Sequence, residues 1–277
     1  MLNSDVYENA GFCRFYDWVY DGFEGDIPFY LGLAERYGPP VLEVACGTGR
    51  VTLPLARAGF EVVGIDLSEP MLAIARSKCE CEPEEVRNAV SLIQTDMRHF
   101  RLGRTFCCVF VPNASLFHLH DAVALRQCFA CLFEHTRPGG VLAVDLVAPK
   151  RMANQEVGDL HLVGEGMNPF TGLMTKEYNR KLAIDRDRQI VRVEHVYVED
   201  AGTRDRRYAF TQDYRWIEEK EGANWFSEAG YVGMKTFGDY EGSPYSLDSH
   251  RLILVGERPD RDGIAPCYTR FPRVATR

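Results

Sequence analysis

Two glycines stand close together near the start of the chain, between an apolar run and a helical pattern. Residues 41–50 read VLEVACGTGR, so Gly47 and Gly49 come directly after the apolar run Val41–Ala45. Glycine lets a backbone approach a ligand closely, and the start of the following helix presents unpaired N–H groups. This order of strand, glycine loop and helix is typical of sites that bind nucleotides.

The details of this loop separate two kinds of ligand. A dinucleotide site uses the series G-x-G-x-x-G and places pyrophosphate at the helix start, but Thr52 occupies the third position here. Glu43 stands just before the loop, where a carboxylate would repel pyrophosphate and attract a cationic ligand. A nicotinamide dehydrogenase is therefore the weaker alternative.

Acidic residues follow the next two predicted strands. Asp66 ends the strand Phe60–Ile65, at 66 − 47 = 19 residues after Gly47, and Asp96 follows the strand Val90–Gln94. Acids at such positions pair with the ribose hydroxyls of nucleotide ligands. An ordinary role as a helix cap or loop acid is the alternative for both. Ser68 is expected to cap the helix that follows Asp66.

These segments together resemble the motifs of class I S-adenosylmethionine-dependent methyltransferases. Residues 41–50 are similar to the first motif, residues 64–68 (GIDLS) to the second-strand motif, and residues 94–97 (QTDM) to the third-strand motif. Residues 138–145 (PGGVLAVD) resemble the turn before the fifth strand. The resemblance covers about residues 41–147 and implies S-adenosyl-L-methionine as the cofactor.

The resemblance also implies a set of cofactor contacts. Asp66 is expected to hold both ribose hydroxyls, Asp96 to accept from the adenine amino group, and Glu43 to face the amino or sulfonium end. The full expected set is Tyr20, Glu43, Ala45, Gly47, Gly49, Asp66, Leu67, Met71, Asp96, Met97 and Asn113. An ion pair inside the fold is the alternative for Glu43.

Two side chains are predicted to act in catalysis. His118 follows the fourth strand, Phe106–Val111, and could take the acceptor's proton because a neutral imidazole is available at pH 7. Tyr16 and Tyr20 lie four residues apart on one helix face, and in similar small-molecule methyltransferases such a tyrosine closes over the methionine part of the cofactor. Ordinary packing is the alternative for all three.

The acceptor is expected beneath an antiparallel insertion that follows the fifth strand. Residues 149–220 contain three long strand patterns, Met174–Ile184, Gln189–Val198 and Arg207–Glu218, and many aromatic side chains. Aromatic lining suits a small organic molecule. The predicted substrate contacts are Ser115, Phe117, Met174 and Tyr178. The same aromatic residues could instead form a sheet core or a homodimer contact.

The order of elements predicts the fold class. Strand and helix patterns alternate over residues 41–147, which indicates an α/β, Rossmann-like, doubly wound, mostly parallel sheet of seven strands with the insertion after the fifth. The predicted divisions are a helical cap (1–40), a core (41–148 and 221–258), the insertion as a lid (149–220) and a loosely ordered tail (259–277). The layout resembles bacterial aminosugar N,N-dimethyltransferases, which favours nitrogen over oxygen as the acceptor atom.

Composition and charge exclude several classes of partner and location. The formal net charge of −8 argues against a nucleic acid. A membrane span and a secretory signal are not expected, which makes the cytoplasm the default location. Zinc could bind Cys79, Cys81, Cys128 and Cys131, but Cys128 and Cys131 follow a buried helix stripe, so no metal is expected. A non-catalytic cofactor-binding or interaction protein on the same fold is the alternative function.

Overall fold

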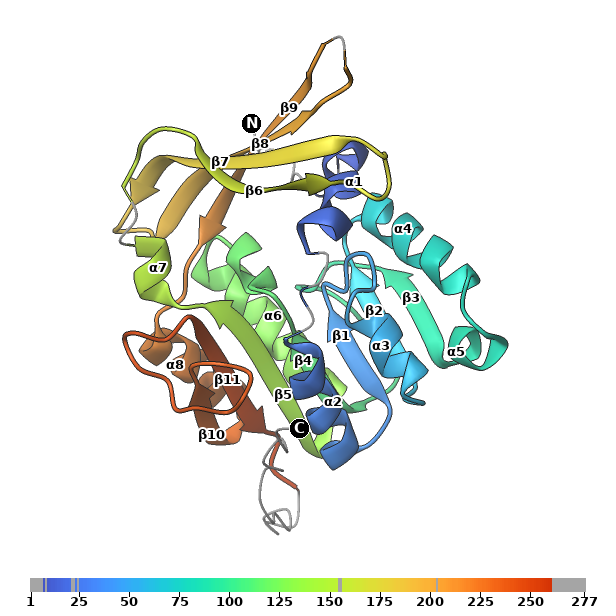
Figure 1. Ribbon diagram of the computed structural model, residues 1–277. Helices are drawn as coiled ribbons and strands as arrows, with labels where there is room; N and C mark the ends of the chain where they lie inside the picture. Colours follow the sequence, from blue (N-terminus) through green and yellow to red (C-terminus); the bar gives the residue numbers. More distant parts are fainter. Residues whose placement is uncertain are drawn as a thin grey trace.

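The computed structural model describes residues 7, 9–20, 23, 25–153, 156–202 and 204–260 (Figure 1). The predicted tail therefore lies outside the described residues from position 261 onward. Figure 1 shows two sheets, a large one surrounded by helices and a smaller one lying across its upper end.

The larger sheet has seven strands in the order β10-β11-β5-β4-β1-β2-β3. Its strands are β1 (Val41–Val44), β2 (Val62–Asp66), β3 (Val90–Gln94), β4 (Phe106–Val111), β5 (Thr136–Val147), β10 (Val232–Phe237) and β11 (Arg251–Glu257). β11 pairs antiparallel with both β5 and β10, and the other pairs are parallel. This topology confirms the predicted α/β fold with a mostly parallel seven-stranded sheet.

Helices cover both faces of this sheet. The α-helices of the described residues are α1 (Ala10–Val19), α2 (Ile27–Tyr37), α3 (Thr52–Arg57), α4 (Glu69–Glu80), α5 (Glu84–Ala89), α6 (Ala122–His135), α7 (Pro149–Ala153) and α8 (Glu219–Ala229), of which α1 lies beneath the insertion. One apolar cluster joins the sheet to α6 and α8, and another joins it to α2 and α3. Every residue of β4 is buried, as expected for a strand covered on both faces. The Ser68 side chain caps α4, as predicted, by accepting from the Met71 N–H at 3.1 Å.

The fifth strand begins earlier than expected. Residues 138–145 resemble a turn before this strand, but β5 already pairs from Thr136. Gly139 has a φ of 75°, and the pairing register between β4 and β5 shifts at this point. Gly139 also donates to the Arg258 carbonyl at 2.9 Å. The glycines therefore form an irregularity within a continuing strand rather than a turn.

The insertion forms an antiparallel sheet of four strands, where three were predicted. It contains β6 (His161–Met167), β7 (Met174–Asp185), β8 (Ile190–Glu199) and β9 (Arg206–Arg215). β6 was missed because its two glycines interrupt the alternation that identifies a strand. β9 stops at Arg215 instead of Glu218 because Trp216 and Ile217 turn into the apolar core below.

Helix α1 attaches the insertion to the core. It lies beneath the insertion sheet in Figure 1, and the Phe15 ring stacks on the Tyr197 ring with centroids 4.3 Å apart. Arg14 forms an ion pair with the buried Glu199 at 2.5 Å. Because α1 also contacts α4, it connects the insertion to the edge of the large sheet where the strands end.

Gly64 lies in the middle of β2, where the glycine loop packs on the sheet. A substitution at this position tests how tight that packing is. A Cβ at this position would lie 2.9 Å from Cys46 Sγ and 3.1 Å from Leu92 Cδ2. We expect Gly64→Ala to lower the free energy of unfolding by about 1–3 kcal/mol through overpacking, measured by urea denaturation. Gly164→Ala in β6 is the matched control, because its new Cβ meets nothing within 4 Å. Equal stabilities of the two variants would contradict this packing.

Candidate functional site

A cavity of about 500 Å³ opens where the strands of the large sheet end. The predicted site residues in its wall are Tyr16, Ala45, Gly47, Asp66, Leu67, Met71, Asp96, Met97, Asn113, Ser115 and His118. They come from α1, from the ends of β1 to β4 and from the loops and helices that follow those strands, because the carboxyl ends of neighbouring parallel strands share one edge of the sheet. The fold thus brings together side chains that are up to about a hundred residues apart.

The carboxylate of Asp66 organises the glycine loop. One of its oxygens accepts from the Gly47 N–H at 2.7 Å, and the other accepts from the Ser68 N–H at 2.8 Å. Gly47 and Ala45 both have positive φ angles, of 54° and 61°, so the loop holds a non-glycine residue in the left-handed region. Each carboxylate oxygen can accept more than one hydrogen bond, so these contacts are compatible with holding hydroxyl groups of a ligand.

Asp96 lies in the cavity wall with a cationic partner that sequence reasoning missed. Arg98 donates from Nη2 to one Asp96 oxygen at 2.5 Å and from Nε to the other at 3.0 Å. This contact lowers the pKa of the Asp96 carboxyl below its usual value. The side chain is therefore a carboxylate, an acceptor suited to an amino group. The pattern Asp-x-Arg was the available signal, since a guanidinium two residues away can reach the acid.

Glu43 does not lie in the cavity wall. Its side chain is 1% exposed, and it accepts a hydrogen bond from the Thr52 hydroxyl at the start of α3. Burial raises the pKa of Glu43 from its usual value of 4.5 to about 8. The predicted contact with a cationic ligand is replaced by a contact that ties β1 to α3. Thr52, which distinguishes this loop from a dinucleotide motif, donates the hydrogen bond that makes this contact.

Five other predicted site residues are also absent from the cavity wall. Gly49 packs against Leu53 and Ala75 behind the loop, and Phe117 is buried in the core cluster. The Tyr20 ring packs against the Tyr16 ring at an angle of 42°, with ring centroids 4.7 Å apart. On β7, Met174 is 42% exposed, and both it and Tyr178 alternate with the buried Thr175 and Glu177. Since side chains alternate across a strand, Met174 and Tyr178 face away from the core.

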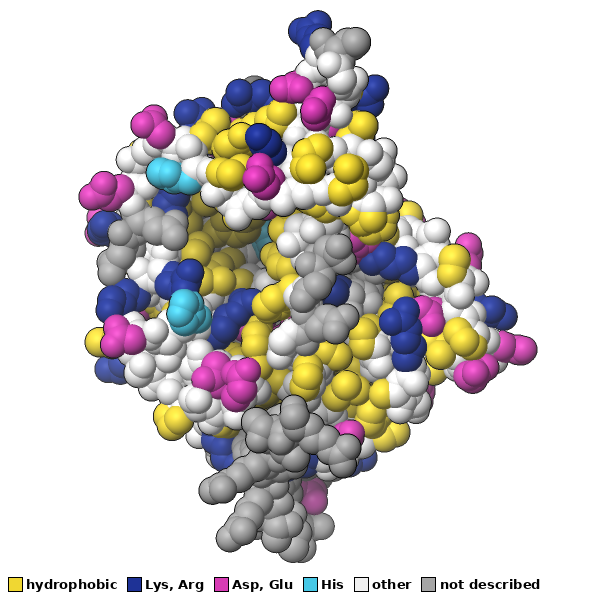
Figure 2. All heavy atoms as spheres, viewed as in Figure 1, with side chains coloured by type: hydrophobic (Ala, Val, Ile, Leu, Met, Phe, Trp, Pro, Cys, Tyr) yellow, Lys and Arg dark blue, Asp and Glu magenta, His cyan; other side chains and the backbone are white. Residues whose placement is uncertain are grey.

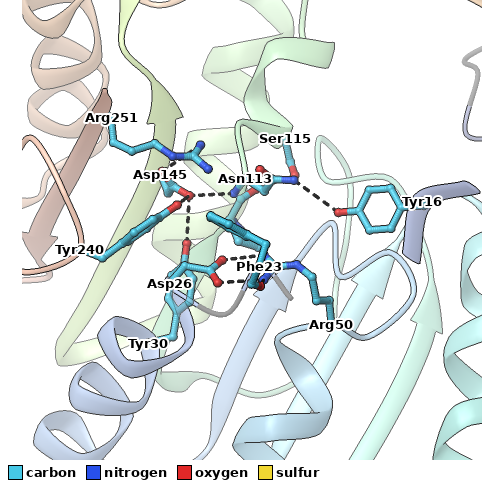
Figure 3. Close-up of polar contacts among 11 residues, drawn as sticks. Tyr16, Phe23, Asp26, Tyr30, Arg50, Asn113, Ser115, Asp145, Tyr240 and Arg251 are labelled. Carbon is cyan, nitrogen blue, oxygen red and sulfur yellow. Dashed lines mark hydrogen bonds and ion pairs between the residues drawn. The ribbon is translucent and has the colours of Figure 1, made fainter. Parts of the chain in front are cut away.

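Tyr16 is held by a chain of polar contacts that crosses the sheet (Figure 3). The Asn113 Nδ2 group donates to the Tyr16 hydroxyl at 3.4 Å, and the Asn113 backbone N–H donates to the Asp145 carboxylate at 3.1 Å. Asn113 and Ala114 both have positive φ angles, of 51° and 59°. Ala114 donates its N–H to the Asp145 carbonyl at 2.8 Å. Asp145 on β5 therefore holds two consecutive strained residues in place.

Asp145 is itself fixed from the far edge of the sheet. The Tyr240 hydroxyl donates to it at 2.8 Å, and Arg251 lies 3.6 Å away as an ion-pair partner. Asp26 and Arg50 form a neighbouring buried ion pair, at 2.5 Å, beside Tyr20. Asp26, Arg50, Asp145 and Arg251 were not predicted, because the polar partners of a buried acid come from elements far apart in sequence.

His118 lies in the cavity wall between two aromatic rings. The ring of Tyr7 is 5.1 Å away and nearly perpendicular, and the ring of Tyr214 from the insertion is 5.4 Å away. His118 follows β4 in a short 3-10 helix, η2 (Ser115–His118), which also contacts β9. The predicted pair of Tyr16 and His118 therefore lines one cavity, with the insertion beside His118.

Cys128 is buried, as its helix stripe predicts, whereas Cys131 is only partly buried. Cys107, Cys108 and Cys128 are buried, and burial raises the pKa of the Cys128 thiol. Within the described part of the chain, no group of three or more His, Cys, Asp or Glu side chains is arranged to hold a metal ion. None of the helices among these residues is long and apolar enough to cross a membrane.

The sequence of the large sheet matches a known family. Residues 41–140, from the first strand to the start of β5, match the family described as a methyltransferase domain. The chain contains a methyltransferase domain. Enzymes of this class I type use S-adenosylmethionine as the methyl donor.

Relatives of the methyltransferase domain include enzymes that act on sugars. A dTDP-3-amino-3,4,6-trideoxy-alpha-D-glucopyranose N,N-dimethyltransferase of Streptomyces venezuelae is 37% identical over 143 residues, covering 52% of this chain and 56% of that protein. The chain spans about half the length of the curated relatives it matches.

Solved structures resemble the chain over most of its length. DesVI of Streptomyces venezuelae has a TM-score of 0.68 and 25% identity, covering 88% of this chain and 96% of that one. The CcbJ methyltransferase from Streptomyces caelestis has a TM-score of 0.73 and 24% identity, covering 85% of this chain and 90% of that one. These likenesses support the same Rossmann-like fold.

The buried Glu43 predicts a pH-dependent stability. The folded protein keeps the Glu43 proton up to about pH 8, whereas the unfolded chain releases it above pH 4.5, so this group lowers stability as pH rises between these values. Glu43→Gln keeps an acceptor for Thr52 and removes this effect. Relative to the wild type, the free energy of unfolding of the variant should rise by about 1.4 kcal/mol per pH unit between pH 4.5 and about 8.

Urea denaturation at several pH values measures this difference. Glu85→Gln, at an exposed position on α5, is the matched control and should track the wild type. A stability difference between Glu43→Gln and the wild type that stays constant from pH 5 to about 8 would contradict the protonated, buried state of Glu43.

Proposed function

We propose that this protein transfers a methyl group from S-adenosyl-L-methionine to a nitrogen atom of a small-molecule acceptor. The observation that carries the proposal is the cavity at the strand ends, whose wall combines Asp66, Asp96 and the glycine loop with Tyr16 and His118. The N,N-dimethyltransferase among the relatives supports nitrogen as the acceptor atom. Oxygen is the alternative acceptor atom.

The residues of the cavity fit this cofactor. Asp66 offers carboxylate oxygens for the ribose hydroxyls, and Asp96 with the adjacent Met97 backbone suits the adenine ring. The backbone of Ala45 and Gly47, together with Tyr16 and Asn113, would hold the methionine part. When bound, S-adenosylmethionine supplies an electrophilic methyl group on a sulfonium centre.

The protein's contribution to the reaction is alignment and exclusion of water. Tyr16 is half-buried, and its removal from water raises the pKa of its phenol, so the hydroxyl stays protonated. Its oxygen accepts from Asn113, which directs the phenol hydrogen away from that amide. In this proposal Tyr16 closes over the cofactor, and His118 and Ser115, which also line the cavity, offer polar groups to the acceptor.

The acceptor site is proposed to lie beneath the insertion. Figure 2 shows the surface hollowed between the insertion and the core, with hydrophobic side chains gathered in the hollow. Apolar walls with few polar groups are typical of sites for small organic molecules. A nucleic-acid partner is not proposed, since the net charge is −8. The cytoplasm is the proposed location.

A homodimer through the insertion is proposed from its exposed apolar side chains. β6 is an edge strand, and Leu162, Val163 and Met167 on it are 51, 57 and 59% exposed. Edge strands with apolar surface favour pairing with another chain. We expect light scattering to report twice the chain mass, and Val163→Lys to lower it to that of one chain. A monomeric wild type, or a Val163→Lys protein of unchanged mass, would contradict this dimer.

The assignment of the cofactor site is tested by calorimetry with S-adenosylmethionine. We expect the wild-type protein to bind and Asp66→Ala to lose at least about a hundredfold in affinity, because it removes the ribose acceptors and the anchor of the glycine loop. Asp66→Asn keeps one acceptor oxygen and should bind with intermediate affinity. Asp187→Ala, exposed on the turn after β7, is the control.

Unchanged affinity in Asp66→Ala would place the cofactor elsewhere. Titration with a reduced nicotinamide, followed by fluorescence, addresses the dehydrogenase alternative. Binding of that nucleotide in place of S-adenosylmethionine would overturn the proposed function.

A further inference from the structure

Helix α1 carries an acid, Asp17, directly after the tyrosine that lines the cavity. The Asp17 side chain is only 13% exposed. One of its carboxylate oxygens accepts from the Thr48 hydroxyl at 2.6 Å, and the other lies 2.6 Å from Lys78 Nζ. Lys78 also donates to the Thr48 carbonyl at 3.1 Å. Asp17 therefore joins three elements, which are α1, the glycine loop and the last turn of α4.

Tyr16 contacts the same loop one residue earlier. A Cβ atom on Gly47 would lie 4.0 Å from Tyr16 Cε1, so the tyrosine ring packs over this glycine. Tyr16 and Asp17 are consecutive on α1, and they contact the neighbouring loop residues Gly47 and Thr48. The position of the Tyr16 ring is thus set relative to the loop that is proposed to hold the methionine part of the cofactor.

The contacts of Asp17 are the stronger of those that hold this end of α1. The contact between the Tyr16 hydroxyl and Asn113 is long, at 3.4 Å, and joins two neutral groups. Hydrogen bonds to an ionised group are shorter and roughly twice as strong as neutral ones. Thr48 is fully buried, so loss of the Asp17 carboxylate would take an acceptor from a hydroxyl that water does not reach.

Another side of α1 holds the insertion. The Phe15 ring stacks on the Tyr197 ring at 3°, and Arg14 pairs with the fully buried Glu199. Tyr197 and Glu199 both lie on β8. Figure 1 shows α1 beneath the insertion and next to α4. A single helix therefore contacts the glycine loop on one side and the middle of the insertion sheet on the other.

We propose that Asp17 is a positioning residue that couples the glycine loop to the insertion: it fastens α1 to Thr48, so that a cofactor bound against the loop also holds Tyr16 and β8 in place. The identity of that cofactor rests on the proposed function. A ligand that restricts the loop reduces the freedom of α1 and of the insertion, so less freedom is lost when an acceptor binds beneath the insertion. The coupling is reciprocal, so an acceptor in that place strengthens cofactor binding.

Amide hydrogen exchange with S-adenosylhomocysteine measures this coupling without an acceptor. We expect a saturating concentration of this ligand to slow exchange in α1 and β8 of the wild type by about tenfold, an ordinary size for coupling between two sites. In Asp17→Ala the ligand should still bind, because Asp66 and Gly47 are unchanged. Exchange in β8 of that variant should then change by less than about twofold. Calorimetry sets the saturating concentration for each protein.

Two further variants separate the contacts of Asp17. Thr48→Val keeps the shape of the side chain and removes the hydroxyl, so it should reduce the response of β8 from the loop side. The double variant should respond as Asp17→Ala does alone, because both changes break the same contact. Asp17→Asn keeps an acceptor for Thr48 and loses the charge that pairs with Lys78, so its response should be intermediate. Glu35→Gln, at an exposed position on α2, is the matched control and should respond as the wild type.

A purely structural role for Asp17 gives a different result. Asp17→Ala would then lower the free energy of unfolding in urea and leave the response of β8 to the ligand unchanged, which would overturn the proposal. Binding to the wild type with no response in β8 would also overturn it, and the proposed function would stand. If the wild type does not bind S-adenosylhomocysteine, the proposed function and the coupling both fail. Exchange in α1 without ligand tests the attachment by itself, and equal rates in the wild type and Asp17→Ala would contradict it.

Discussion

The carboxylate of Asp66 is the contact on which the cavity depends. It accepts from Gly47 in the loop after β1 and from Ser68 at the start of α4, so it ties two neighbouring strand ends into one surface. The loop that it holds contains Ala45 with a positive φ, a conformation that costs a non-glycine residue free energy. The same carboxylate faces the cavity, so one side chain both holds the glycine loop in place and is available to bind the proposed ligand.

The other walls of the cavity are assembled from three directions. Asp145 holds the strained turn at Asn113 from within the sheet, and Asn113 in turn contacts Tyr16 on α1. The insertion adds Gln212 beside His118 and is attached to α1 through stacking on Phe15. Because these contacts share α1 and the loop after β4, a displacement of the insertion would move both Tyr16 and His118.

The fold and the grouping of the proposed cofactor residues in one cavity were predictable from local patterns. Gly47, Asp66, Asp96 and Met97 could be found because strand ends in an α/β sheet always meet at one edge. The acceptor side was less predictable. Met174 and Tyr178 were predicted as substrate contacts, but their side chains lie on the face of β7 opposite the buried Thr175 and Glu177, and composition does not show which face of a strand is buried.

The partners of buried polar side chains could also not be predicted from the sequence, because they lie on elements that are far apart along the chain. Asp145 on β5 pairs with Tyr240, 95 residues further along the chain, and with Arg251 on β11. The most direct test of the whole account is a crystal structure with S-adenosylhomocysteine. It should show the ribose on Asp66 and the sulfur directed toward Tyr16 and His118. Binding outside this cavity, or with the sulfur directed away from these two residues, would contradict the account.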